Sequence, residues 1–306
     1  MFDVLLRMAG LIALGAGWRR LRPGGIDADV LRGALSTLVY YLLLPALVVQ
    51  TLWSSNLGLD SLRIAATAAA VVIAGWTLGW LAARRMRLPA ARTGALLLAA
   101  AFPNATYMGL PALDAALGSV GAGIAIQFDY FACTPILLTF GVVMAQRYGS
   151  GGERVPAWLR LARVPPFWAA LAGVGLNALG APLPAALAGL LTTLGGAVVP
   201  LMLLALGMSL SWRALDAATA RAMLPVLAIQ LLLQPLLALA LTAGLGLDGV
   251  LRTGTVLEAA MPSMVLGIVL CDRYGLDARY YSLTVTVSTA LSLVSLPLWL
   301  YALGGP

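Results

Sequence analysis

Two short stretches within otherwise apolar sequence carry residues that could hold a small polar molecule. The first places an amide, a hydroxyl, a phenol and a glycine between two prolines: Pro103, Asn104, Thr106, Tyr107, Gly109 and Pro111. The second is a shorter run of Pro262, Ser263 and Met264. Amide, hydroxyl and phenol groups can all donate hydrogen bonds to an anion. The two stretches therefore predict binding positions inside the apolar part of the chain.

The prolines also predict that the backbone is interrupted at both stretches. A proline lacks the amide hydrogen and obstructs the preceding turn, so a helix running through either stretch should break or unwind. In lipid, such a break survives only where it is buried in protein or lines a water-filled cavity. Each break leaves a helix end whose free N–H groups and positive dipole favour a carboxylate. A lone proline is more often only a kink that helps packing, but two matched breaks together with Asn104 favour a binding site.

Two acidic residues, Asp129 and Glu258, lie inside apolar segments. An ionised carboxylate in lipid costs about 3 kcal/mol or more, so each should face protein or water, or be protonated. Glu258 lies one helical turn before Pro262 and, when charged, would repel an anion bound at the break. We therefore predict Glu258 as a protonation site coupled to binding and Asp129 as a second one; the alternative is a neutral acid hydrogen-bonded within the core. Gln127, in the same segment as Asp129, is an additional candidate.

The composition indicates a polytopic membrane protein. Of 306 residues, 61% are hydrophobic and 10% charged, and the mean hydropathy is +0.94, which is typical of a chain with many membrane spans. The net charge of +7 comes from arginines in short loops, so we expect no nucleic-acid partner. Histidine is absent and no paired Gly-x-Gly-Asp motif occurs, so we expect neither catalytic residues nor a metal site nor a cofactor. Cys133 and Cys271 are isolated and predicted to be inert core residues.

Ten apolar segments are predicted to cross the membrane. They cover approximately residues 3–18, 31–53, 61–83, 93–113, 120–145, 165–180, 184–210, 219–245, 250–272 and 280–303. Most of them reach the ~20 residues that span hydrocarbon, while the first and sixth are short. The polar stretch 149–164, predicted to be a cytoplasmic linker, separates a first five-span repeat (residues 1–148) from a second (residues 165–306).

The arginines predict how the spans are oriented. All but Arg7, Arg63 and Arg252 lie in alternate loops or at their margins. Because basic loops stay on the cytoplasmic side, both termini are predicted to lie outside a bacterial inner membrane. The Met1–Trp18 segment has no basic start and no small-residue cleavage site, and is therefore interpreted as a retained first span.

The two five-span halves are predicted to be inverted relative to each other. Five is an odd number, so the second half must enter the membrane from the opposite side. Pro45 precedes Pro103 by 58 residues, and Pro200 precedes Pro262 by 62. Inverted repeats with paired breaks are typical of secondary transporters.

The motifs at these prolines resemble those of the auxin efflux carrier family. They are Tyr40-Tyr41-Leu42-Leu43-Leu44-Pro45-Ala46-Leu47, Phe102-Pro103-Asn104 followed by Gly109-Leu110-Pro111, and Glu258-Ala259-Ala260-Met261-Pro262. The resemblance covers essentially the whole chain. One departure is Ser263 and the residues after it, where relatives often carry an asparagine.

The resemblance implies an all-α fold of ten helices in two inverted five-helix repeats, as in NhaA-like proteins. Spans 1, 2, 6 and 7 would form a scaffold that mediates homodimers, and spans 3–5 and 8–10 a moving core in which broken spans 4 and 9 cross. The family's substrates are malate, malonate and similar carboxylates, or the auxin anion. The resulting expectation is an elevator-type secondary carrier that moves a small organic anion through the lipid membrane.

The coupling ion is predicted to be H+, with Na+ as the alternative. Other functions kept open are a sodium-coupled or uncoupled carrier of the bile-acid-symporter type, and a sensor or channel with transporter architecture. Clustered carboxylates and carbonyls would favour sodium.

Overall fold

The computed structural model describes residues 2–55, 57–151, 162, 164–210 and 216–304. Within these ranges the chain is helical, and two residues form an isolated β-bridge. The helices of the first half are α1 (Phe2–Leu21), α2 (Ala28–Leu38), α3 (Leu44–Ser54), α4 (Leu59–Met86), α5 (Ala90–Ala101), α6 (Leu110–Phe128), α7 (Thr134–Ile136) and α8 (Val142–Tyr148). Those of the second half are α10 (Pro165–Ala178), α11 (Ala185–Gly196), α12 (Val198–Ser209), α13 (Ala217–Ala228), α14 (Gln234–Gly244), α15 (Gly249–Ala259), α16 (Gly267–Tyr274) and α17 (Ala278–Ala302).

Wider π-helical turns join several of these helices into longer ones. They are η2 (Val39–Leu43), η3 (Ala105–Gly109), η4 (Asp129–Cys133), η5 (Leu137–Gly141) and η6 (Ile229–Leu233), and a short 3-10 turn η1 (Pro23–Gly25) precedes α2. Four of the five π turns end two residues before a proline: Pro45, Pro111, Pro135 and Pro235. Proline cannot bond to the carbonyl four residues earlier and clashes with it. Widening the preceding turn accommodates that carbonyl without ending the helix.

Six helical segments of the described chain are long and apolar enough to cross a membrane. They are Ala28–Ser54, Leu59–Met86, Ala105–Tyr148, Ala185–Ser209, Ala217–Gly244 and Ala278–Ala302. These findings are consistent with a multi-pass membrane protein, while the count of ten crossings stays a prediction. The predicted linker 149–164 lies largely outside the described residues.

The segment Ala105–Tyr148 turns back on itself at Gly118. Its 44 residues would measure about 66 Å as one straight helix, roughly twice the hydrocarbon thickness. Gly118 has φ 65° and ψ −155°, a conformation open essentially to glycine. A Cβ on Gly121 would lie 2.2 Å from the carbonyl oxygen of Leu113, so the chain after the turn packs closely against the chain before it. This position falls in the loop predicted between residues 113 and 120.

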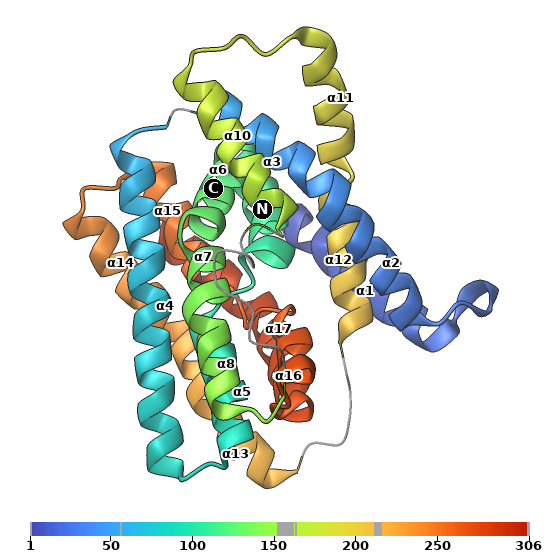
Figure 1. The fold of residues 1–306 in the computed structure, drawn as a ribbon, viewed down its shortest axis with the longest axis vertical. Coiled ribbons are helices and arrows are strands. Elements are labelled where there is room, and N and C mark those ends of the chain that lie inside the picture. The colour runs from blue at the N-terminus through green and yellow to red at the C-terminus, as the bar shows by residue number, and fades with distance from the viewer. Residues whose placement is uncertain (1, 56, 152–161, 163, 211–215, 305–306) are drawn as a thin grey trace.

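The helices pack as two groups (Figure 1). In one group α1 lies along α12 and α3 lies along α10. Gly15 and Gly207 allow close contact between α1 and α12, because a Cβ on either would lie within 2.2 Å of a backbone oxygen of the other helix. In the other group α4 packs on α5 and α14, and α15 packs on α6 and α14. The broken segments described below lie in this second group.

Candidate functional site

The helix that begins at Ala90 is interrupted at Pro103. α5 ends at Ala101, Phe102 is extended (φ −107°, ψ 113°), and η3 begins after Asn104 (φ −81°, ψ 56°). The second predicted break is also present: α15 ends at Ala259 and α16 begins at Gly267. Both prolines therefore separate two helices, as their missing N–H groups require.

The two interruptions pair with each other. The amide of Asn104 donates to the carbonyl of Pro262 at 2.8 Å, and the amide of Met264 donates to the carbonyl of Phe102 at 3.1 Å. Together they form an antiparallel bridge centred on Pro103 and Ser263. Backbone groups freed by the breaks thus satisfy each other inside the protein, which is the condition for broken helices at membrane depth. We call this pairing the crossing.

Side chains from three other positions cap the carbonyl end of α5. The amide group of Gln230 and the hydroxyl of Ser263 both donate to the carbonyl of Ala99, at 2.7 and 2.8 Å. Gln234 donates to the carbonyls of Ala100 and Ala101 at 3.1 and 3.2 Å. Neither glutamine was among the site residues predicted from the sequence. Their spacing, one helical turn apart in an apolar segment, was the available signal.

A small cavity of about 50 Å3 opens at the crossing. Six of its lining residues were predicted from the sequence: Pro103, Asn104, Thr106, Tyr107, Asp129 and Met264. Two polar residues that the prediction missed also line it, Cys133 and Thr134. Cys133 lies four residues after Asp129, a helical spacing that was visible in the sequence. Thr134, five residues after Asp129, comes to the same side through the π turn η4.

The polar groups of this crossing cavity form one network and leave one donor free. The hydroxyls of Thr106 and Thr134 both donate to the carboxylate of Asp129, Thr134 at 2.9 Å. The amide nitrogen of Asn104 is buried and has no hydrogen-bond partner among the described residues. An unpaired buried donor is costly, and at a cavity it is well placed to bind an acceptor from a ligand.

Glu258 lies behind the crossing rather than on its cavity. The side chain is fully buried, and neither carboxyl oxygen has a hydrogen-bond partner among the described residues. It packs directly on Gly109: a Cβ at that position would lie 2.4 Å from both carboxyl oxygens. Gly109 thus serves the site by leaving room for Glu258. Pro262 and Ser263 contribute through the backbone bridge and the cap of α5.

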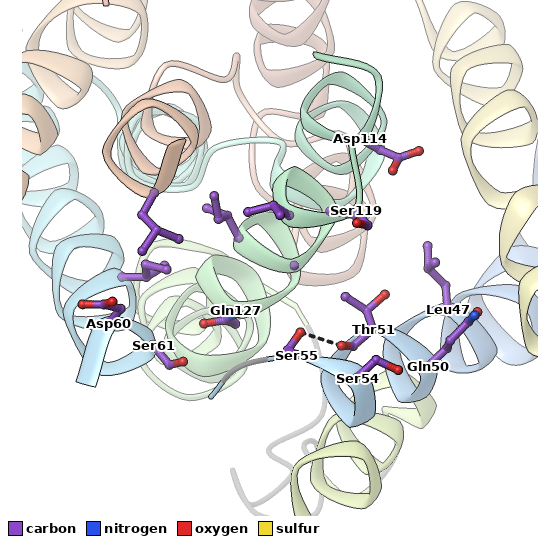
Figure 2. A pocket seen from close by; sticks show the side chains of 16 residues that line it. Leu47, Gln50, Thr51, Ser54, Ser55, Asp60, Ser61, Asp114, Ser119 and Gln127 are labelled. Carbon is purple, nitrogen blue, oxygen red and sulfur yellow. Dashed lines mark hydrogen bonds between the residues drawn. The ribbon is translucent and has the colours of Figure 1, made fainter. Parts of the chain in front are cut away.

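Gln127 lines a different and larger cavity of about 490 Å3 (Figure 2). This cavity is bounded mainly by polar side chains from α3 and the residue after it, the start of α4, and α6 on both sides of Gly118: Gln50, Thr51, Ser54, Ser55, Asp60, Ser61, Asp114, Ser119 and Gln127. It lies between the two helix groups near the α3–α4 connection. The structure therefore separates Gln127 from Asn104 and Asp129, although it is two residues from Asp129 in sequence.

Comparisons with known proteins agree with a transport role. The chain matches the membrane transport protein family over residues 11–153 and 154–300. It is 36% identical over 301 residues to an uncharacterized transporter of Methanothermobacter thermautotrophicus, covering 97% of this chain and 96% of that one. It is 29% identical over 313 residues to a protein of Rhizobium meliloti named "Putative malonate transporter", covering 97% and 94%. An uncharacterized transporter of Methanocaldococcus jannaschii is 24% identical over 87% of each chain.

Proposed function

Because the chain belongs to the membrane transport protein family, the auxin efflux carrier family that its motifs resemble, we propose that it is a secondary carrier for a small organic anion. The anion binds at the crossing of the broken helices. An elevator-type movement of the core then exposes the crossing to the other side of the membrane. The substrate is a mono- or dicarboxylate of the malonate, malate or auxin class. The name of the Rhizobium relative supports malonate as the first compound to test.

The crossing cavity is the observation that carries this proposal. Asn104 contributes a buried amide donor that has no partner among the described residues, and the helix that starts at η3 directs its N-terminal N–H groups to the same region. Both features favour a carboxylate. Thr106 and Tyr107 add a hydroxyl and an aromatic wall. The small volume of the cavity favours a binding mode in which the cavity encloses the carboxylate of the substrate and not the whole molecule.

The proposal includes ten spans in two inverted repeats, residues 1–148 and 165–306, joined by the cytoplasmic linker 149–164. Helix packing supports this arrangement. In the predicted numbering of spans, α1 (first span) packs on α12 (seventh), and α10 (sixth span) packs on α3 (second). The first span of each half thus packs on the second span of the other half. The first group of helices would be the scaffold and the second the moving core. Homodimers through the scaffold and a bacterial inner membrane location with both termini outside complete the proposal.

We propose proton coupling through the buried carboxylates. Asp129 lines the crossing cavity and accepts from Thr106, so a proton on it would change the charge next to the bound anion. Glu258, the first candidate from the sequence, is one shell further away behind Gly109. These contacts favour Asp129 over Glu258 as the coupling carboxylate in this proposal. Sodium coupling is the alternative, and the uptake experiment below distinguishes it from proton coupling.

Uptake of labelled malonate into proteoliposomes tests the proposal. We expect saturable uptake that an imposed pH gradient drives to accumulation, with external Na+ replaceable by choline. N104A should slow uptake about tenfold or more, since it removes a hydrogen bond to a charged group. N177A is the matched control: its amide donates to the carbonyls of Trp53 and Ser55, at 2.9 and 2.7 Å, away from the crossing.

Each other outcome selects a different function. Loss of accumulation in choline indicates sodium coupling, and downhill uptake that ignores both gradients indicates an uncoupled carrier. Flux that does not saturate indicates a channel, and malonate binding without flux indicates a sensor. In D129N, pH-driven accumulation should disappear while exchange of internal for external malonate persists. Unchanged pH dependence in both D129N and E258Q would contradict coupling through these residues.

A further inference from the structure

Another cavity, of about 100 Å3, adjoins the crossing. Its lining comes from α2, η3, α12 and the residues around the start of α16, so it lies at the boundary between the two helix groups. Its lining includes Arg32, Ser36, Tyr107, Leu206, Leu266 and Val269. Tyr107 and Leu266 line the crossing cavity as well. The two cavities thus meet at these two side chains.

Arg32 brings a positive charge and an unused hydrogen-bond donor to the 100 Å3 cavity. Its Nε atom is buried and has no hydrogen-bond partner among the described residues. The carboxylate of Asp29 is 3.6 Å from this Nε, too far for a hydrogen bond, and is held more closely by Arg19 at 2.7 Å. Asp29 is also largely exposed, 58% of its side chain, so water weakens its hold on Arg32.

The other walls suit the two ends of a small organic anion. Arg32, Ser36 and Tyr107 line the same cavity, so a guanidinium, a hydroxyl and a phenol face one small space. A planar guanidinium flanked by a hydroxyl matches a carboxylate, which it can bind through two parallel hydrogen bonds. Leu206, Leu266 and Val269 provide apolar surface for a short hydrocarbon portion.

We propose that Arg32 and Ser36 form a docking position, called the dock below, for the carboxylate of the transported anion. From the dock the anion passes Tyr107 to reach the crossing. The position lies on the arginine-rich face of the protein, near the start of α2, which follows Arg19 in the last turn of α1 and Arg22 in the short connection. This inference rests on the proposed carrier function for its physiological substrate. It adds a binding site that is separate from the crossing and serves only one face of the membrane.

Chemical protection of Arg32 tests the dock without requiring transport. Purified protein is treated with phenylglyoxal, which modifies exposed guanidinium groups; the Arg32 side chain is 31% exposed. Mass spectrometry then follows each arginine. We expect malonate, at ionic strength matched with chloride, to slow the modification of Arg32 several-fold. Arg22, exposed and 3.5 Å from the Asp27 carboxylate, should react at the same rate with and without malonate.

Two variants separate the dock from the crossing. In N104A the protection of Arg32 should persist, because the dock does not use Asn104. In proteoliposomes, R32Q should raise the half-saturation concentration for malonate offered at the arginine-rich face about tenfold or more, and leave the opposite face unchanged. R22Q, with the same loss of charge, should alter neither face.

The outcomes distinguish the dock from the carrier function. Protection of Arg32 in a protein that transports no malonate would support the dock and contradict the carrier proposal. Malonate uptake without protection of Arg32, or protection that N104A abolishes, would overturn the dock and leave the carrier proposal standing. An R32Q effect equal on both faces would also overturn it.

Discussion

Gly109 and Glu258 form a close contact between the two broken segments. Because a Cβ on Gly109 would lie 2.4 Å from both carboxyl oxygens of Glu258, G109A should force the buried side chain to shift. We expect a destabilisation of about 1–3 kcal/mol, the usual cost of overpacking, and reduced transport. The measurement is thermal unfolding in detergent together with malonate uptake.

A double-mutant cycle identifies the cause of that loss. E258A removes the carboxyl group, so G109A should cost clearly less in the E258A background than in the wild type. E258Q, which keeps the shape, should not relieve the clash. G175A is the control, since a Cβ there meets nothing within 4 Å and alanine favours the helix. Equal costs of G109A in the wild-type and E258A backgrounds would contradict the contact.

The sequence identified most residues of the crossing but not their grouping. Proline and asparagine types pointed to Pro103 and Asn104, because a break and a donor are properties of single residues. That Glu258 contacts Gly109, or that Thr106 donates to Asp129, depends on how separate segments pack. Such contacts between segments leave no local pattern in the chain.

Gln234 joins the two halves of the chain. Its amide donates to the carbonyl of Val71 in α4, at 3.0 Å, and to Ala100 and Ala101 at the end of α5. A Cβ on Gly75 would lie 2.1 Å from this amide nitrogen. The break at Pro103 leaves the α5 carbonyls without helical partners, and Gln234 replaces them.

Removing this amide should destabilise the crossing. We expect Q234L to lower the free energy of unfolding by about 1–3 kcal/mol, because buried carbonyls lose their donor, and to lower the melting temperature in detergent. Q50L is the control: Gln50 donates to the hydroxyl of Thr192 at 2.6 Å at an exposed position, where water can replace it. A melting temperature in Q234L equal to that of Q50L would show that the cap is dispensable.

The positions of the helices along the chain were predicted more closely than the irregular turns within them. Hydrophobic length located α4 and α17 within a few residues of the predicted spans 61–83 and 280–303. The π turns that precede Pro45 and Pro235 were not predicted, because proline signals a disturbed helix without specifying whether it ends, bends or widens. The turn at Gly118 agrees with the predicted loop, and its positive φ explains why glycine occupies it.

The arginine distribution leads to a prediction about the membrane topology of the chain. If ten spans place both termini outside, Leu59 and Ala185 lie on the outer face while Ala90 and Ala217 lie on the cytoplasmic face. All four are exposed near helix ends in the structure. We expect single cysteines at positions 59 and 185, in a C133A/C271A background, to react with a membrane-impermeant maleimide in intact cells. Those at 90 and 217 should react only after permeabilisation.

The pair of positions 185 and 217 bears most directly on the inverted repeat. Position 185 follows α10, whose 14 residues are fewer than the ~20 that cross hydrocarbon without tilt or thinning. If α10 does not cross, the first span of the second half is lost and the two halves cannot be inverted copies. Position 185 would then be protected in intact cells like position 90, and the exchanged packing of α1 with α12 and α3 with α10 would need another explanation. Suppose instead that position 185 is labelled in intact cells, as position 59 is, and that position 217 is protected, as position 90 is. Then α10 and the α11–α12 segment must each cross the membrane once, in the directions that the inverted repeat demands.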